Sequence, residues 1–131
     1  MAMRIAKSAP AYFPKRKPAK SKAYLAWIHD LPCVVTGRHG VEAAHLSFAA
    51  TEYAHYGRAK GRKAPDRWAL PLCSEEHHKQ HDMGDERAYW QQTGINPHIM
   101  ALVLHGLWSE MGEDATEAAT AVIMQGVTEN E

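Results

Sequence analysis

The stretch Leu70-Pro-Leu-Cys-Ser-Glu-Glu-His-His-Lys-Gln-His81 decides the fold, because an apolar run leads directly into a polar one. The apolar half continues the preceding residues and predicts a buried strand over residues 68–72, interrupted by its proline. Ser74 is a favourable N-cap, and the two glutamates after it bring negative charge to the first turn of a helix. We therefore predict a strand followed immediately by a helix from Ser74 to about Asp82.

Two histidines share one face of this predicted helix. His77 and His81 are four residues apart and therefore lie about one turn apart on the same side. Two imidazoles in this arrangement can bind one metal ion and leave its other side open. A surface histidine pair that binds nothing fits the same spacing, so the pattern alone leaves both readings open. His78 points elsewhere, roughly 100° around the helix.

The residues before this segment predict a β-hairpin. Residues 33–37 form a β-branched run that ends in glycine, and residues 41–46 form a second short extended stretch. Gly37-Arg-His-Gly40 between them has the composition of a turn. After the histidine helix, Asp85 predicts a helix over residues 86–93, and Asn96-Pro97 opens another that runs to about Trp108. The fold class is therefore α+β, with a short hairpin, a metal-bearing helix and additional C-terminal helices.

Both ends of the chain differ in composition from the middle. Residues 1–22 are basic and rich in proline, and they predict a disordered tail. Residues 23–108 form the predicted domain, and residues 109–131 form an acidic C-terminal segment without Lys or Arg. Asp114-x-x-Glu117 could begin a short helix there, which either docks on a protein partner or is half-disordered.

The net charge of zero hides an asymmetry between the two halves. Residues 1–63 hold 12 Lys and Arg against 3 Asp and Glu, whereas residues 64–131 hold 3 against 12. This division indicates a half that faces nucleic acid, although solvated tails at both ends would give the same counts. The long stretch 47–67 shows no periodicity and carries four candidate phosphate-binding residues. These residues are Arg58, Lys60, Arg62 and Lys63.

Composition also bounds the class of protein. The 131 residues correspond to one domain, and no run of roughly 18 apolar residues predicts a membrane span. The N-terminal residues carry charge and proline where a signal peptide needs an apolar stretch, so we expect a cytoplasmic protein. In that compartment Cys33 and Cys73 point to metal ligation rather than to a disulfide.

Several landmarks in one order resemble a known family. They are Cys33-x-x-Thr36, Glu42-Ala-Ala-His45-Leu-Ser-Phe-Ala, Gly61-Arg-Lys-x-x-Asp66, Pro71-Leu-Cys73 with the histidine helix, Gly84-Asp-Glu-Arg-Ala-Tyr-Trp90 and Gly94-Ile-Asn-Pro97. Together they resemble the HNH (ββα-metal) nucleases of phage and bacterial genomes, close to the recombination-enhancement (Ref-like) proteins. The likeness runs from about Leu31 to Trp108.

The resemblance implies a DNA endonuclease with named roles. His45 matches the histidine that activates water, and His77 and His81 match the ligands of a catalytic Mg²⁺ or Mn²⁺ ion. Cys33 and Cys73 match two members of a structural Zn²⁺ knot. We expect the phosphate contacts to give little sequence specificity.

Three positions depart from the family pattern. Ala44 stands where relatives have a metal-ligating Asp or His, and Thr36 and Glu76 stand where relatives complete the zinc site. A remaining knot would have to borrow ligands from His78, His39 or Glu76. The HNH asparagine is also not obvious. Asp66 is the nearest polar residue that could orient His45.

These departures leave two alternatives to an active nuclease. The first is a DNA-binding module that keeps the HNH fold and has lost the chemistry. The second is a protein-interaction adaptor that acts through the acidic C-terminal segment.

Overall fold

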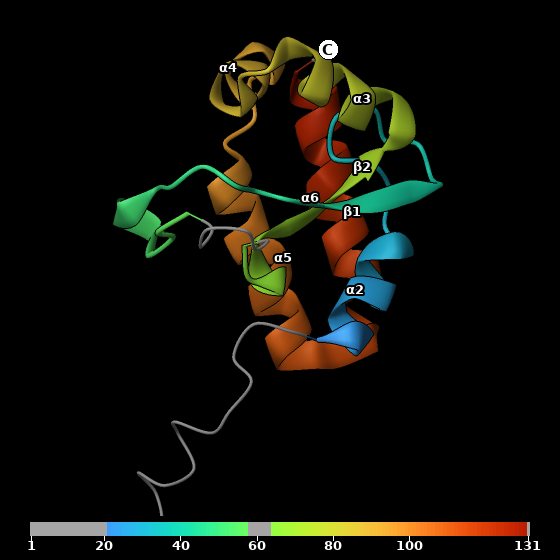
Figure 1. Cartoon of the computed structure of the whole chain (residues 1–131). Coiled ribbons are helices and arrows are strands. Elements are labelled where there is room, and N and C mark those ends of the chain that lie inside the picture. Colours follow the sequence, from blue (N-terminus) through green and yellow to red (C-terminus); the bar gives the residue numbers. More distant parts are fainter. Residues whose placement is uncertain (1–20, 58–63, 131) are drawn as a thin grey trace, which may run out of the picture.

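The computed structural model of the chain describes residues 21–57 and 64–130, and the fold is α+β (Figure 1). A two-stranded antiparallel sheet crosses the middle of the molecule, with helices on both sides of it. The elements follow in the order α2 (Lys22–His29), β1 (Val41–His45), η1 (Thr51–Tyr53), η2 (Asp66–Trp68), β2 (Ala69–Cys73), α3 (Ser74–Met83), α4 (Glu86–Thr93), α5 (Pro97–Met111), η3 (Gly112–Ala115) and α6 (Thr116–Glu129).

The predicted hairpin between residues 33–37 and 41–46 is wrong. The second stretch is the strand β1, but its partner is β2, with Val41 opposite Cys73 and His45 opposite Ala69. Residues 33–38 instead form a tight turn, because the amide of Gly37 donates to the carbonyl of Cys33 at 2.8 Å. The two paired strands are therefore distant in sequence, and α3 follows the second strand without a break.

Pro71 lies inside β2 and does not break it. It pairs in register with Ala43, and its carbonyl accepts a hydrogen bond from the amide of Val34 at 3.0 Å. In a two-stranded sheet each strand has one free edge, so a missing amide can face away from the partner strand without loss. The strand is one residue later than predicted, at Ala69–Cys73.

The helix boundaries follow local capping signals. The Asp85 side chain accepts from the amide of Ala88, and the Asn96 side chain accepts from the amides of His98 and Ile99, as the sequence predicts. The predicted cap at Ser74 is wrong, because α3 already includes this residue and Cys73 holds the cap position without a side-chain bond. At the N-terminal end, α2 begins at Lys22 with Ser21 as its cap.

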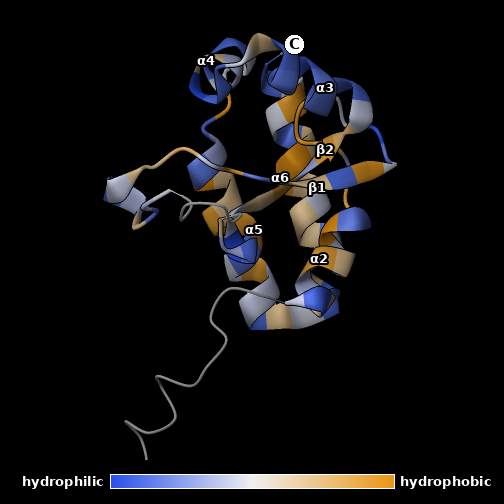
Figure 2. Ribbon diagram, in the orientation of Figure 1, coloured by the Kyte–Doolittle hydropathy of each residue, from blue (hydrophilic) through white to orange (hydrophobic). Residues whose placement is uncertain are grey.

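The acidic C-terminal segment contributes to the hydrophobic core. Ala119 and Ile123 of α6 are fully buried and belong to the same core cluster as Ile28 of α2 and Leu72 of β2. Coloured by hydropathy, α3 and α4 are largely hydrophilic, whereas β2 and much of α5 and α6 are apolar (Figure 2). The polar helices therefore lie above a core to which α6 belongs.

Within the described ranges, no helix has the length and hydropathy that a membrane crossing requires. The predicted disordered tail falls almost wholly on residues 1–20, which lie outside the described residues. The same holds for Arg58, Lys60, Arg62 and Lys63, the predicted phosphate contacts.

Candidate active site

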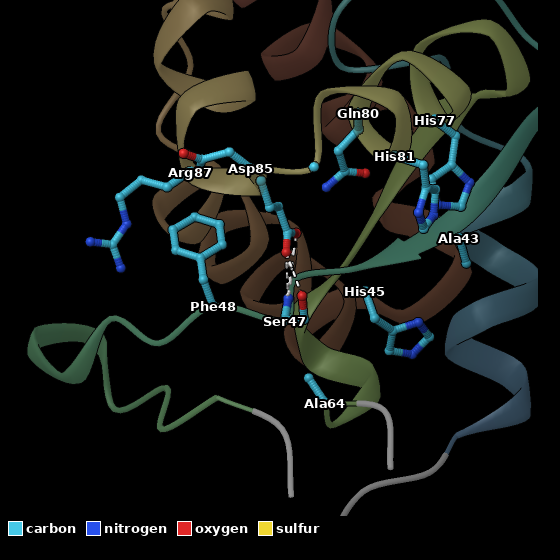
Figure 3. A pocket seen from close by; sticks show the side chains of 12 residues that line it. Ala43, His45, Ser47, Phe48, Ala64, His77, Gln80, His81, Asp85 and Arg87 are labelled. Atoms are coloured by element: carbon cyan, nitrogen blue, oxygen red, sulfur yellow. Dashed lines mark hydrogen bonds between the residues drawn. The ribbon is translucent and has the colours of Figure 1, made fainter. Parts of the chain in front are cut away.

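A cleft of about 860 Å³ opens between the sheet, α3 and the start of α4 (Figure 3). All three histidines that the sequence analysis selected for catalysis line it. Its walls are Ala43, His45, Ser47, Phe48, Ala64, His77, Gln80, His81, Gly84, Asp85, Glu86 and Arg87.

His45 and Asp66 form a hydrogen-bonded pair. His45 is the last residue of β1, and Asp66 begins the short turn that leads into β2 opposite it. The distance from His45 Nε2 to Asp66 Oδ1 is 2.8 Å, and the two side chains are only 12% and 15% exposed. The structure therefore places Asp66 where the sequence analysis suggested an orienting group for His45.

The second carboxylate oxygen of Asp66 is also held. The backbone amide of Ser21 donates to Oδ2 at 2.8 Å. An ionised carboxylate can only accept, so His45 Nε2 carries the proton of the shared bond. The lone pair of His45 is then on Nδ1, which is the tautomer that a general base needs.

His77 and His81 lie side by side on α3, with ring centroids 4.9 Å apart. His77 Nδ1 lies 2.6 Å from Oε1 of Glu42 on β1, and this hydrogen bond lowers the pKa of the Glu42 carboxyl. The carboxylate fixes the ring and leaves His77 Nε2 free, an arrangement common around metal-bound histidines. The sequence analysis missed this role of Glu42, because only the fold brings β1 beside α3.

The cleft offers only part of a ligand set for the metal ion that the sequence analysis expects. Within residues 21–57 and 64–130, no group of three or more His, Cys, Asp or Glu side chains has the geometry of a metal site. The imidazoles of His77 and His81 fit as two ligands, so water and phosphate oxygens would have to complete the coordination. Ala44, the position at which the resemblance to HNH nucleases implies a ligand, is only 4% exposed and packs in the core.

The far wall of the cleft comes from α4. Glu86 accepts hydrogen bonds from the amide and the hydroxyl of Ser47, which joins the end of β1 to the start of α4. The guanidinium carbon of Arg87 lies 5.3 Å from the centre of the Phe48 ring. These four residues were not selected from the sequence, since only the fold brings 47–48 beside 86–87.

The two cysteines lie together at the other end of the sheet and are both buried. The amide of Thr36 donates to Cys33 Sγ at 3.4 Å, and the Thr36 hydroxyl lies 3.8 Å from Cys73 Sγ. Arg38 also reaches Cys73 Sγ at 3.8 Å and forms an ion pair with Glu75. Burial raises the pKa of the Cys33 thiol, but bonds from Thr36 and nearby amides outweigh burial and lower it.

A four-ligand zinc site does not fit this end of the molecule. Glu76 accepts a hydrogen bond from the Tyr89 hydroxyl at 2.7 Å and is already satisfied. His78 and His39 are exposed, and neither is bonded to a cysteine in the described part of the chain. The structure thus brings Cys33 and Cys73 together but does not supply the borrowed ligands.

A further histidine pair is buried beside the cleft. His55 Nδ1 lies 2.8 Å from His98 Nε2, and the same His98 nitrogen lies 3.2 Å from the carbonyl of Phe48. His55 also stacks on Trp68. His98 is only 2% exposed and packs edge-to-face with Phe48. Burial, with the neighbouring His98 and Arg67, lowers the pKa of His55 to about 4.

The comparisons with known proteins identify a family. No curated protein and no solved structure matches the chain. The family model described as "Protein of unknown function (DUF968)" matches residues 1–109, and the chain belongs to this family.

Proposed function

We propose that the protein is a metal-dependent HNH endonuclease that hydrolyses DNA phosphodiester bonds with little sequence specificity. The observation that carries this proposal is one cleft lined by a carboxylate-held histidine, His45, and by the histidine pair His77 and His81. These are the groups that metal-assisted hydrolysis requires: a base for water and nitrogen ligands for an ion.

The order of elements supports the proposal. The strand β1 ends in the proposed base, β2 returns antiparallel, and α3 follows at once with the proposed ligands. A ββα-metal core has this sequence of elements. The long connection between the strands, rather than a tight hairpin, carries Asp66 back to His45.

His45 is the proposed general base. Asp66 accepts a hydrogen bond from the Nε2–H of His45 and holds the ring. Nδ1 can then take a proton from the water molecule that attacks phosphorus. The imidazolium formed in this step is stabilised by the same carboxylate. Asp66 is thus a positioning residue that acts through His45.

His77 and His81 are the proposed ligands of Mg²⁺ or Mn²⁺. Such an ion would supply charge stabilisation for the phosphate and the leaving oxygen. Glu42 orients His77, so its removal should weaken metal affinity rather than abolish proton transfer. We propose no step for a structural Zn²⁺ ion, because the described residues do not assemble a site for it.

The test is a plasmid-nicking assay across Mg²⁺, Mn²⁺, Ni²⁺ and Zn²⁺ with wild type, His77→Ala and His29→Ala. His29 is a matched control, since it is exposed and its ring bonds only to the carbonyl of Leu25 in its own helix. Metal-dependent nicking should fall strongly in His77→Ala and stay unchanged in His29→Ala. Full nicking by His77→Ala would remove this residue from the mechanism.

One observation favours a second candidate, DNA binding without cleavage. Ala44 is buried in the core, so among the described residues the cleft offers the ion two histidine ligands, His77 and His81, besides the proposed base. If this candidate is correct, no metal in the assay supports nicking, while DNA binding is the same in wild type and His45→Ala. The nuclease proposal is correct if His45→Ala binds DNA and loses a cleavage signal that wild type has.

A further inference from the structure

A second cavity of about 730 Å³ adjoins the catalytic cleft. The residues Phe48 and Arg87 line both hollows and therefore form the border between them. The cavity lies between the segment 48–53, α4 and the turn that leads into α5. Its volume falls in the range of roughly 300–1,000 Å³ that is usual for small-molecule sites. A substrate strand in the cleft would thus have this cavity as its immediate neighbour.

The border residues have the chemistry of a nucleotide contact. The side chain of Phe48 is half-buried, and the edge of the His98 ring packs on it with centroids 4.8 Å apart. Arg87 is exposed and lies over the Phe48 ring. Single-stranded nucleic acids are bound by such a combination of aromatic platforms and cations, because every base has a face that can stack.

The walls of the cavity favour a base over a phosphate. Glu52 lines it and would repel an anion, whereas Gln91 offers an exposed amide that can both donate and accept. Trp90 also lines it, and its indole N–H has no hydrogen-bond partner among the described residues. The cation at the border, Arg87, is in contrast suited to the phosphate that links the two hollows.

We propose that the second cavity is a subsite for an unpaired base next to the scissile phosphate, and that the substrate is DNA with a single-stranded segment. The subsite rests on the proposed nuclease function, because its position is defined relative to the catalytic cleft. Phe48 stacks on the base, and Arg87 binds the adjoining phosphate. A base within a duplex is stacked and paired, so it cannot enter such a pocket without leaving the helix.

The experiment measures binding without cleavage. A thymidine oligonucleotide that carries one 2-aminopurine is titrated with the full-length protein in EDTA, and fluorescence quenching reports stacking of that base. Wild type should quench the probe, and Phe48→Leu should lose most of the quenching and about tenfold in affinity, since one base stack is worth roughly 1–3 kcal/mol. Tyr56→Leu is the matched control, because Tyr56 is 76% exposed and lines neither hollow.

A salt titration separates the base from the phosphate. Arg87→Gln should reduce the slope of log affinity against log salt by about 0.7, the share of one phosphate on a single strand. Phe48→Leu should leave this slope unchanged. The same probe in a duplex should be quenched much less than in the single strand. Equal quenching by wild type and Phe48→Leu, or equal quenching in duplex and single strand, would overturn the subsite.

Failure of the subsite is distinguishable from failure of the nuclease proposal. Quenching is measured without metal, whereas nicking is measured with it. Metal-dependent nicking without Phe48-dependent quenching contradicts the subsite alone. Quenching without nicking contradicts the nuclease and supports the base pocket.

Discussion

Both ends of the small sheet carry reactive side chains, but the surroundings of these side chains differ. At one end, His45 pairs with Asp66 at 2.8 Å, and His45 lines an open cleft. At the other end, opposite Val41, Cys73 is buried with Cys33, and its sulfur has long contacts with Thr36 and Arg38. One end therefore has a short hydrogen bond at the wall of a cleft, whereas the cysteines at the other end belong to the hydrophobic core.

This difference indicates at which end of the sheet we expect a metal ion to bind. In the cleft, His77 bonds to Glu42 through Nδ1, and neither its Nε2 nor the His81 ring is bonded to a described residue. At the cysteine end, the Thr36 hydroxyl contacts Cys73 Sγ, and the Glu76 carboxylate accepts a hydrogen bond from Tyr89. These polar groups already have partners within the protein. We therefore expect removal of metal to affect activity and to leave the fold intact.

The largest effect should come from the base itself. His45→Ala should lower the nicking rate by about 10²–10⁴-fold, because general-base catalysis contributes this much. DNA affinity, measured by fluorescence anisotropy, should stay within about twofold of wild type, since phosphate contacts dominate affinity. If His45→Ala nicks at the wild-type rate, His45 is not the base, and the proposed difference between the two ends of the sheet is wrong.

The second effect concerns the positioning carboxylate. Asp66→Asn should lower nicking by about 10–100-fold, because the amide can donate to His45 Nε2 and favour the wrong tautomer. The shape of the pH–rate profile should change, whereas a merely structural loss would lower the rate equally at every pH. Asp66→Glu should restore part of the rate if the carboxylate acts through the ring.

A third prediction tests the cysteine end. Cys33→Ala should cost roughly 1–2 kcal/mol in the free energy of unfolding, as is usual for a small change in the core. Cys73→Ser should leave the nicking rate unchanged. Incubation with a chelator should leave the Tm of wild type unchanged, and stoichiometric zinc in the purified protein, measured by emission spectroscopy, would contradict this account of the packing.

The smallest predicted effect is a loss of folding stability at acid pH. The unfolded chain binds protons at His55 near pH 6.5, whereas the folded pKa is about 4, so stability should fall as the pH falls through this window. Burial lowers the pKa of His98 as well, which acts in the same direction. The loss should be at most about 1.4 kcal/mol per pH unit for each proton.

The measurement is urea unfolding at about pH 7 and about pH 5, with wild type and His55→Phe. The variant retains an aromatic ring against Trp68 and removes one titrating group, so its stability should depend less on pH. Cys33→Ala should keep the wild-type pH dependence, because it lies at the other end of the sheet. An unchanged pH dependence in His55→Phe would place the acid sensitivity elsewhere.

Local signals in the sequence were enough for the helices but not for the sheet. Capping at Asp85 and Asn96 predicted α4 and α5. The extended stretch 41–46 and the apolar run 68–72 predicted both strands within a few residues, whereas the β-branched run 33–37 forms a turn. The pairing was wrong, because short runs separated by glycines favour a local hairpin. The true partner of β1 lies beyond a stretch without periodicity, and nothing local to Val41–His45 indicates it.

For the site, sequence motifs predicted the residues that belong to one pattern and missed the residues that only the fold brings together. The four-residue spacing predicted the pair on α3, and chain order suggested Asp66 for His45. Phe48 and Arg87 line the cleft, and Glu42 bonds to His77, only because the fold brings β1 and the residues after it beside α3 and α4. The core position of α6 was likewise not resolved from composition, since acidic exposed positions hide its three buried ones.

The bond between Ser21 and Asp66 has a mechanical consequence. The basic residues 1–20 continue directly into Ser21, whose amide donates to the carboxylate that holds His45. A displacement of the backbone at Ser21 would therefore be passed to that carboxylate through one hydrogen bond. In the proposed nuclease, such a displacement would change the orientation of the imidazole.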